Sequence, residues 1–183
     1  TAEQLGLEEL EILQLLSTLE SVDGRFQYLV SEGKITAIID YAHTPDALKN
    51  VLETINTIRS GNEQLITVVG CGGDRDVEKR PKMGAIAAQL STKVIFTSDN
   101  PRSENPDTII QHIEAGVPPQ HYKKTIAISD RKQAIKTACQ MANEHDIILV
   151  AGKGHETYQE IQGVRSEFDD RKTISELLIA LNK

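Results

Sequence analysis

One stretch of the sequence constrains the fold most: a buried strand that runs into a glycine-rich turn and then a helix. The apolar run Leu65-Ile-Thr-Val-Val69 predicts the strand, and Gly70-Cys-Gly-Gly-Asp-Arg-Asp76 follows it directly. Glycines let the backbone turn sharply and approach a ligand closely, and Pro81 suits the first turn of a helix. This order is typical of an anion or amino-acid site at the edge of a parallel sheet. The alternative is a tight turn with a solvated Arg-Asp pair.

The turn does not fit the dinucleotide-binding fingerprint G-x-G-x-x-G. Arg75 stands where the third glycine is needed, so a fixed positive charge lies where a pyrophosphate-binding backbone usually sits. Cys71, inside the turn, has no His or Lys within two residues. We therefore interpret Cys71 as a small residue that fills a tight turn and not as a nucleophile.

Strand and helix patterns alternate along the rest of the chain. The sequence predicts strands at residues 26–30, 35–39, 65–69, 93–97, 126–128 and 146–151, the first two as a hairpin. It predicts helices at about 3–20, 45–59, 81–91, 106–115 and 131–144, and a last one that ends near 181, with caps at Thr44 or Asp46 and at Asp130. Residues 157–167 look irregular. The spacing predicts an α/β doubly wound sheet, mostly parallel after an antiparallel entry hairpin.

Bulk composition excludes several classes of function. The 183 residues carry a net charge of -7 and no basic tract, which argues against binding to nucleic acid. The longest apolar run is too short to span a membrane, and no signal-peptide pattern is present. Cys71 and Cys139 make no disulfide framework and no zinc motif, so a reducing cytoplasm is the simplest setting. Because Thr1 is not methionine and a helix pattern begins at once, we expect a longer native protein.

Clusters of polar residues and glycines come directly after four of the predicted strands. They are Asp40 to Asp46, Gly70 to Asp76, Asp99 to Arg102, and Gly152 to Glu156. The carboxyl ends of parallel strands share one edge of a sheet, and ligands bind at that edge. We therefore expect the four clusters to converge on one site.

Each cluster alone has a plainer interpretation. Asp99-Asn-Pro-Arg102 is also ordinary turn chemistry, although Arg102 offers a planar fork that suits a carboxylate. Gly152-Lys-Gly-His-Glu156 lacks the spacing of a P-loop, and His155 with Glu156 forms either a general-base pair or two loop residues. Asp40 and His43 lie three residues apart, but two ligands do not make a metal site.

Taken together, five motifs resemble the C-terminal domain of the Mur ligases. They are Gly24-Arg-Phe26, Asp40-Tyr-Ala-His-Thr-Pro-Asp46, Gly70-Cys-Gly-Gly-Asp-Arg-Asp76 with Lys79-Arg-Pro81, Asp99-Asn-Pro-Arg102 and Ala151-Gly-Lys-Gly-His-Glu156. The resemblance runs from about residue 22 to the end and is closest to the tripeptide-synthetase branch, which adds meso-diaminopimelate. Asp23 departs from the proline usual in the family, a difference that bears on the stiffness of the hinge between domains.

The resemblance implies a domain organisation and a reaction. Residues 1–22 would be the tail of an upstream central ATPase domain, and residues 23–183 the Rossmann-like Mur ligase C-terminal domain. The whole enzyme would be an ATP-dependent acid–amino-acid ligase that adds meso-diaminopimelate to UDP-N-acetylmuramoyl-L-alanyl-D-glutamate through an acyl phosphate in peptidoglycan synthesis. This chain has no P-loop, so ATP and Mg would be bound mainly by the central domain. We therefore expect the chain to be inactive without its own N-terminal and central domains.

The resemblance also assigns site residues by their place in the motifs. Arg25, Asp40 and His43 would contact ATP as it is clamped between domains. The incoming amino acid would contact Arg75, Asp99, Asn100, Pro101, Arg102, Gly152 and Glu156. No residue of this chain is assigned as catalytic or as a metal ligand.

The charges agree with these assignments. Arg75 and Arg102 suit the distal carboxylate of meso-diaminopimelate, and Glu156 and Asp99 suit its ammonium. Lysine-adding relatives lack the arginine of the Asp99-Asn-Pro-Arg102 motif. A desolvated Arg102 would stay unpaired against lysine, at a cost on the order of a few kcal/mol.

Three alternatives remain open at this point. The first is a lysine-adding ligase of the same family. The second is a dinucleotide-dependent oxidoreductase domain, in which Asp99 would hold a ribose, but Arg75 disfavours it. The third is an interaction module without catalysis, which the intact polar edge disfavours.

Overall fold

The computed structural model describes residues 25–183. The predicted helix at 3–20, Asp23 and the proposed boundary at residue 22 lie outside the described residues. The strands are β1 (Gln27–Val30), β2 (Thr36–Asp40), β3 (Leu65–Val69), β4 (Lys93–Phe96), β5 (Thr125–Ala127), β6 (Ile147–Ala151), β7 (Tyr158–Ile161) and β8 (Val164–Glu167). The helices are α2 (Pro45–Ile58), α3 (Lys79–Leu90), α4 (Pro106–Glu114), α5 (Arg131–Met141) and α6 (Asp170–Ala180), with a 3-10 helix η2 (Pro119–Lys124).

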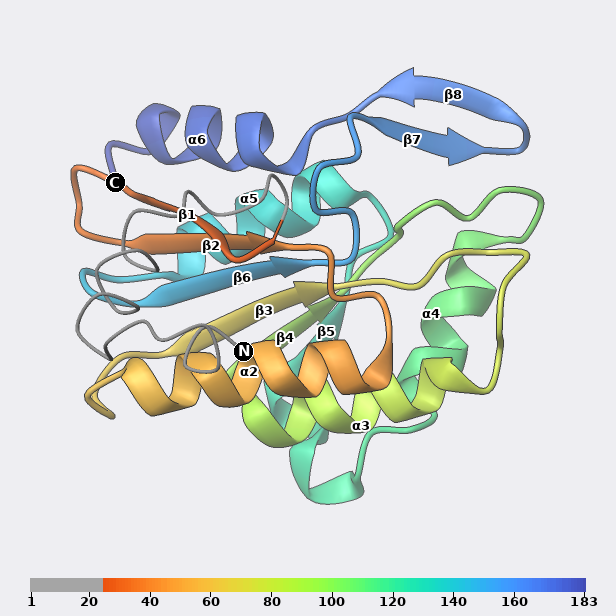
Figure 1. Ribbon diagram of the computed structural model, residues 1–183, viewed down its shortest axis with the longest axis horizontal. Helices are drawn as coiled ribbons and strands as arrows, with labels where there is room; N and C mark the ends of the chain where they lie inside the picture. The colour runs from red at the N-terminus through yellow and green to blue at the C-terminus, as the bar shows by residue number, and fades with distance from the viewer. Residues whose placement is uncertain (1–24) are drawn as a thin grey trace, which may run out of the picture.

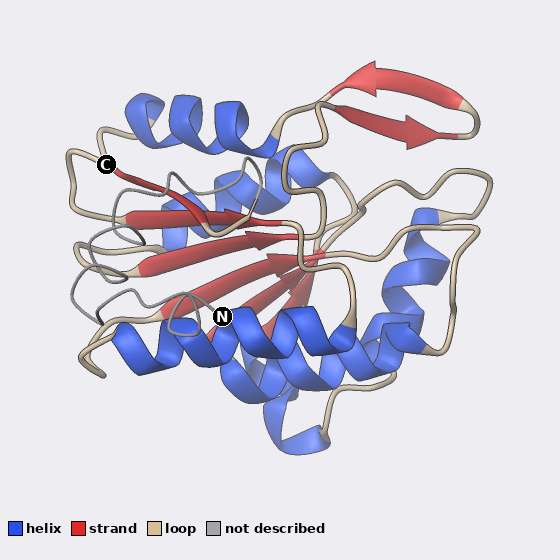
Figure 2. Ribbon diagram, in the orientation of Figure 1, coloured by secondary structure: helices blue, strands red, loops and turns tan. Residues whose placement is uncertain are grey.

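A six-stranded sheet in the order β1-β2-β6-β3-β4-β5 forms the centre of the molecule. β1 pairs antiparallel with β2, and the other neighbours pair in parallel. Helices cover both faces (Figures 1 and 2), with α2 and α3 on one side and α5 and α6 on the other. The predicted α/β class, parallel sheet and antiparallel entry hairpin are confirmed.

Two apolar cores hold these layers together. One lies under α2, α3 and α4 and includes Leu52 and Phe96; the other lies under α5 and α6 and includes Ile135 and Ile174. All five residues of β3 and of β6 are buried, as strands covered on both faces require. Full burial of an aliphatic or Phe side chain stabilises the fold by about 1.5–3 kcal/mol.

Local sequence explains where the helices begin. Thr44 accepts a hydrogen bond from the Ala47 N–H at the start of α2, and Asp130 accepts one from Gln133 at the start of α5. The prediction that Pro81 opens its helix is wrong, because α3 begins at Lys79. Pro81 still lies in the first turn, where a missing N–H leaves no intrahelical bond unmade.

The prediction of an irregular segment at 157–167 is also wrong. β7 and β8 form a two-stranded antiparallel hairpin there, which projects from the sheet at the upper right of Figure 1. Gln162 and Gly163, the two turn residues, both have positive φ (49° and 75°), as a tight hairpin turn requires. No helix within residues 25–183 combines the length and apolar character needed to cross a membrane.

Candidate functional site

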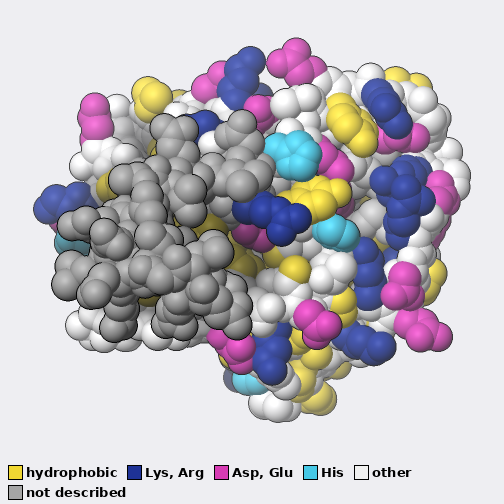
Figure 3. Space-filling view, viewed as in Figure 1, with side chains coloured by type: hydrophobic (Ala, Val, Ile, Leu, Met, Phe, Trp, Pro, Cys, Tyr) yellow, Lys and Arg dark blue, Asp and Glu magenta, His cyan; other side chains and the backbone are white. Residues whose placement is uncertain are grey.

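The carboxyl ends of β2, β3, β4 and β6 bring four loops to one edge of the sheet. Ala151 pairs with both Asp40 and Val69, so these three strands end level with one another, and Phe96 pairs with Val69 in turn. In Figure 3, Lys, Arg and His side chains gather on the right half of the face, over these strand ends. The predicted convergence of the four polar clusters is therefore confirmed.

A cavity of about 460 Å³ lies among these loops. Its lining residues are Tyr41, His43, Thr44, Gly72, Arg75, Asp76, Lys79, Asp99, Asn100, Arg102, Gly152, Glu156 and Tyr158. Every residue that we predicted to contact the incoming amino acid lines it except Pro101. Of the three residues predicted to contact ATP, only His43 lines it.

One wall of the cavity carries two carboxylates that are tied together by a buried ammonium. Asn100 donates from Nδ2 to Glu156 Oε2 at 2.7 Å, and Lys153 Nζ lies 3.3 Å from the same oxygen. Lys153 Nζ also lies 3.8 Å from Asp99 Oδ1, and its side chain is 0% exposed. This wall thus holds two acidic groups against one buried cation, and it suits a ligand ammonium.

Gly152 permits the close approach of the β6 loop to this wall. Its φ is +119°, a region that L side chains rarely adopt, and a Cβ there would lie 2.6 Å from Asp99 Oδ2. A larger residue would displace the carboxylate of Asp99. The predicted role of Gly152 therefore has a steric basis, because the backbone itself forms this part of the lining.

Arg102 also lines the cavity and has a left-handed backbone conformation, with φ 51°. Its backbone N–H donates to Glu160 O at 3.0 Å, and its carbonyl accepts from Gln162 N at 2.6 Å, so the β7–β8 hairpin fixes this residue. The guanidinium donates from Nη1 to Gly73 O at 2.8 Å. Within residues 25–183, its Nε and Nη2 make no hydrogen bond, which leaves donors for an anionic ligand.

Arg80 supports the glycine loop, which is the segment from Gly70 to Asp76 that follows β3. This fully buried side chain forms two 2.8 Å hydrogen bonds with Glu104, and Glu104 Oε1 accepts from the Asp74 N–H at 2.6 Å. The Arg80 guanidinium and the Asp74 backbone hold the pKa of Glu104 below its usual value. Arg75 is exposed and, among residues 25–183, its side chain donates only to Asp74 O at 2.9 Å. Its guanidinium is therefore available to a ligand.

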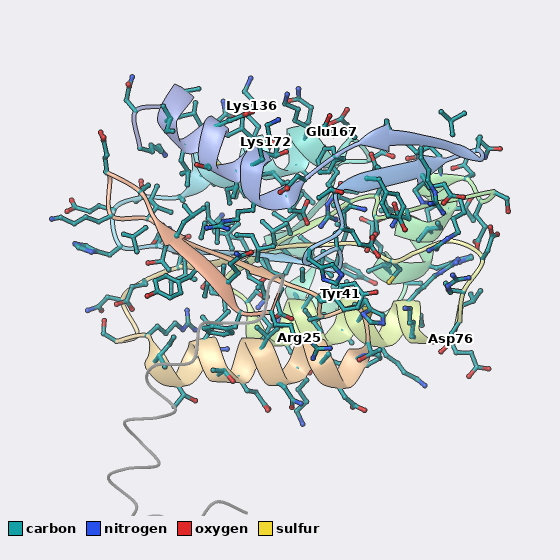
Figure 4. The ribbon with its side chains drawn as sticks, turned by 45° about the horizontal axis from the view of Figure 1, so that its top comes forward. Arg25, Tyr41, Asp76, Lys136, Glu167 and Lys172 are labelled. Atoms are coloured by element: carbon teal, nitrogen blue, oxygen red, sulfur yellow. The ribbon has the colours of Figure 1, made fainter. Side chains whose placement is uncertain are left out.

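The residues predicted to contact ATP lie at the margin of the cavity. Asp40 Oδ2 accepts from the Phe26 N–H at 2.7 Å, and burial raises the pKa of its carboxyl, an effect that backbone hydrogen bonds and Arg25 oppose. His43 Nδ1 lies 2.8 Å from Tyr41 O. In the view of Figure 4, Arg25 lies beside β1, whereas Asp76 lies at the outer end of the glycine loop. The structure thus does not bring Arg25 and Asp40 into the lining.

Residues 24–154 match the family model described as the glutamate ligase domain of the Mur ligases. The chain belongs to the Mur ligase family. This membership agrees with the resemblance found in the sequence and weighs against a dinucleotide-dependent oxidoreductase.

Named relatives of this Mur ligase domain share one description. The UDP-N-acetylmuramoyl-L-alanyl-D-glutamate–2,6-diaminopimelate ligase of Cytophaga hutchinsonii is 57% identical over 183 residues, which is 100% of this chain and 37% of the relative. The ligase of the same name from Bacteroides thetaiotaomicron is 54% identical over 94% of this chain and 36% of its own length. The chain thus spans little more than a third of these relatives.

A solved structure of a ligase of that name has the same fold. It superposes with a TM-score of 0.80 at 41% sequence identity, covering 100% of this chain and 37% of the other. The likeness extends over the whole described sheet and its helices.

Several lining residues of the Mur ligase domain were missed by the sequence analysis. Tyr41 and Lys79 stood inside or beside the quoted motifs but had been given no role, and Thr44 had been assigned only as a helix cap. Tyr158 lay in the segment taken as irregular, although Gly163 within it is a residue that favours a turn. Lys153 does not line the cavity, and its burial beneath it had no signal in the sequence.

Cys71 behaves as the sequence indicated. It is buried against Met83, and burial raises the pKa of its thiol to about 12, so the reactive thiolate does not form near neutral pH. Over the described part of the chain, no group of three or more His, Cys, Asp or Glu side chains could hold a metal ion.

Proposed function

We propose that this chain is the C-terminal, amino-acid-binding domain of the ATP-dependent ligase that adds meso-diaminopimelate to UDP-N-acetylmuramoyl-L-alanyl-D-glutamate in peptidoglycan synthesis. Residues 1–22 would belong to the central domain and residues 23–183 to this one. Family membership and the description shared by the relatives support the proposal. The observation that carries it is that Arg102 and Glu156, from two different loops, line the same cavity.

The chemistry of the cavity suits one end of meso-diaminopimelate. This end is a zwitterion with a carboxylate and an ammonium on one carbon. The free guanidinium nitrogens of Arg102, with the exposed Arg75, would bind the carboxylate through charge-assisted hydrogen bonds. The acidic wall of Asp99 and Glu156 would bind the ammonium. The other amino group of the substrate would then extend toward the remaining domains, where the new amide bond forms.

Arg25, Asp40 and His43 would contribute to the nucleotide site at the margin of the cavity. The sequence has no P-loop, and no acidic cluster for a metal exists within residues 25–183, so ATP and Mg would be held mainly by the central domain. ATP would activate the substrate carboxylate by phosphoryl transfer. The role of this domain is to orient the amine and to exclude water from the closed site.

The same geometry argues for meso-diaminopimelate over lysine. Lysine has no distal carboxylate, so it would leave the guanidinium of Arg102 desolvated and unpaired. A site built to hydrogen-bond a group rejects an analogue that lacks it, by factors that reach about 10⁴ in favourable cases. A lysine-adding ligase is therefore the less favoured candidate.

A kinetic experiment on the full-length protein tests the proposal. We expect Arg102→Ala to raise the KM for meso-diaminopimelate by about a hundredfold, because two charge-assisted hydrogen bonds are lost, and to change the KM for ATP little. Arg171→Ala, which removes an exposed arginine on α6, is the matched control. An unchanged KM for meso-diaminopimelate in Arg102→Ala, or equal use of lysine by the wild-type enzyme, would contradict the proposal.

A further inference from the structure

A buried lysine lies directly behind the acidic wall of the cavity. Lys153 is 0% exposed, does not line the cavity, and places its ammonium within 3.1 Å of Asn100 Oδ1 and 3.3 Å of Glu156 Oε2. We propose that Lys153 is a positioning residue for substrate recognition: it fixes the amide of Asn100 and the carboxylate of Glu156 so that they present one free carboxylate oxygen to the substrate ammonium. The inference deepens the proposed function and rests on it.

The hydrogen bonds around Asn100 allow only one orientation of its amide. Its Oδ1 accepts from Lys153 Nζ at 3.1 Å and from the Glu160 N–H at 3.0 Å, and both of these groups are donors only. Its Nδ2 faces Glu156 Oε2 at 2.7 Å, and an ionised carboxylate is an acceptor only. In a flipped amide, Nδ2 would face the donors of Lys153 and Glu160, and Oδ1 would face the carboxylate of Glu156. Lys153 therefore helps to decide which way Asn100 points.

The same contacts involve one of the two carboxylate oxygens of Glu156. Its Oε2 receives both Asn100 and Lys153, whereas its Oε1 has no hydrogen-bond partner among residues 25–183. Glu156 lines the cavity, so the unused oxygen is the acceptor that a ligand ammonium would find. Without Lys153, Glu156 would lose one of the two contacts that hold its carboxylate in place.

Charge gives Lys153 a second effect on the acidic wall. Its ammonium also lies 3.8 Å from Asp99 Oδ1, so one cation serves two carboxylates and leaves a net negative charge that a substrate ammonium neutralises. Removal of Lys153 would leave both carboxylates without the cation that they share, so neither would be held in place by it. The charged and titratable groups that face this wall from other elements are Tyr41, Arg102, Arg131, Tyr158 and Arg165. They remain in the variant, so a change in substrate binding follows from the loss of Lys153 alone.

The decisive experiment compares Lys153→Met with wild type in the full-length ligase. Met keeps the length of the side chain and removes the charge and the donors. We expect the KM for meso-diaminopimelate to rise about tenfold or more while the KM for ATP stays within about twofold. We also expect kcat at saturating meso-diaminopimelate to stay within about twofold, a split between KM and kcat that a loss of folded enzyme would not produce.

Two further variants make the result decisive. Lys172→Met, which removes an exposed lysine paired with Glu167 on the surface, is the control and should leave both KM values unchanged. In the double variant Lys153→Met with Glu156→Gln, the KM for meso-diaminopimelate should be close to that of Glu156→Gln alone, because Lys153 acts through Glu156. Multiplied effects in the double variant, or equal rises in both KM values for Lys153→Met, would overturn the inference.

Other outcomes separate the inference from the proposed function. If Lys153→Met does not fold, Lys153→Gln keeps a donor for Asn100 without the charge, and equal rises in the KM values for meso-diaminopimelate and ATP in that variant would overturn the inference. A normal KM for meso-diaminopimelate in Lys153→Met, beside a raised one in Arg102→Ala, would refute the role of Lys153 and leave the proposed function intact. Failure of the wild-type enzyme to use meso-diaminopimelate would refute the proposed function itself.

Discussion

Two buried arginines support the candidate site from opposite faces of the sheet, and they differ in how completely they are satisfied. Arg131, the first residue of α5, bonds both oxygens of Asp170, which is also 0% exposed. Arg80, in α3, bonds both oxygens of Glu104, whose side chain is 29% exposed. The Nε of Arg80 is buried and has no hydrogen-bond partner in the described part of the chain, whereas the Nε of Arg131 is bonded.

The remaining bonds of the two arginines show which part of the site each one fixes. Arg131 donates to Ser98 O at 3.1 Å and to Ala151 O at 3.2 Å, the residues directly before Asp99 and Gly152. Arg80 reaches the glycine loop through Gly72 O at 3.4 Å and through Glu104. The strand ends that carry the acidic wall are thus anchored in the core, and the glycine loop that carries Arg75 is anchored near the surface. We infer that the ammonium half of the site is the more rigid one.

The largest effect should follow from removal of the fully buried partner. Asp170→Ala leaves the Arg131 guanidinium charged and unpaired in the core, so we expect the free energy of unfolding to fall by about 3–5 kcal/mol. Denaturant unfolding of the 183-residue chain measures it. Asp107→Ala, an exposed acid in the first turn of α4, is the matched control for the helix-dipole contribution. A loss in Asp170→Ala no larger than in this control would remove the basis of the comparison.

A smaller effect, with a pH dependence, is expected at the other arginine. Glu104→Gln should lower the free energy of unfolding by about 1–2 kcal/mol at pH 7, because Glu104 is partly solvated. The pKa of Glu104 is lowered in the folded state, so its contribution is present above its ordinary value of 4.5 and is lost as pH falls through the folded pKa. Wild type and variant should therefore converge in acid. A difference that stays constant from pH 7 to about pH 3 would show that charge is not its cause.

The comparison also shows how far the sequence could lead. Apolar runs such as Leu65–Val69 predicted the strands, and their alternation with helices predicted the sheet and the shared edge to which Arg102 and Glu156 come. The support of that edge was not predictable: Arg80 and Lys153 stand inside quoted motifs, but nothing in the sequence marks them, or Arg131, as buried. Their burial depends on partners 24, 39 and 53 residues away, and no local pattern encodes such contacts. The sequence motifs identify the site, whereas tertiary packing determines which buried side chains support it.

The smallest effect on the free energy of unfolding, a gain in place of a loss, is expected from a substitution of Asp40. This carboxylate is partly buried and forms no ion pair with any of residues 25–183. Burial raises the pKa of Asp40 above its ordinary value of 3.8, although hydrogen bonds from the backbone oppose this. A raised pKa in the folded state means that the contribution of this group is most favourable below pH 3.8 and is lost as pH rises through the folded pKa. At pH 7 the ionised carboxylate therefore destabilises the fold slightly relative to a neutral group of the same shape.

Asp40→Asn tests this point, since its amide oxygen can still accept from the Phe26 N–H. We expect a small increase in the free energy of unfolding at pH 7 that disappears as pH falls below 3.8, measured on the 183-residue chain by denaturant titration at several pH values. The exposed Asp46→Asn is the control and should show no such gain. A loss of stability in Asp40→Asn at pH 7 would mean that the charge-assisted bond to Phe26 outweighs the cost of burial. Asp40 would then resemble Asp170, with a backbone N–H in the place of the arginine, and the contrast between paired and unpaired carboxylates at this edge would fail.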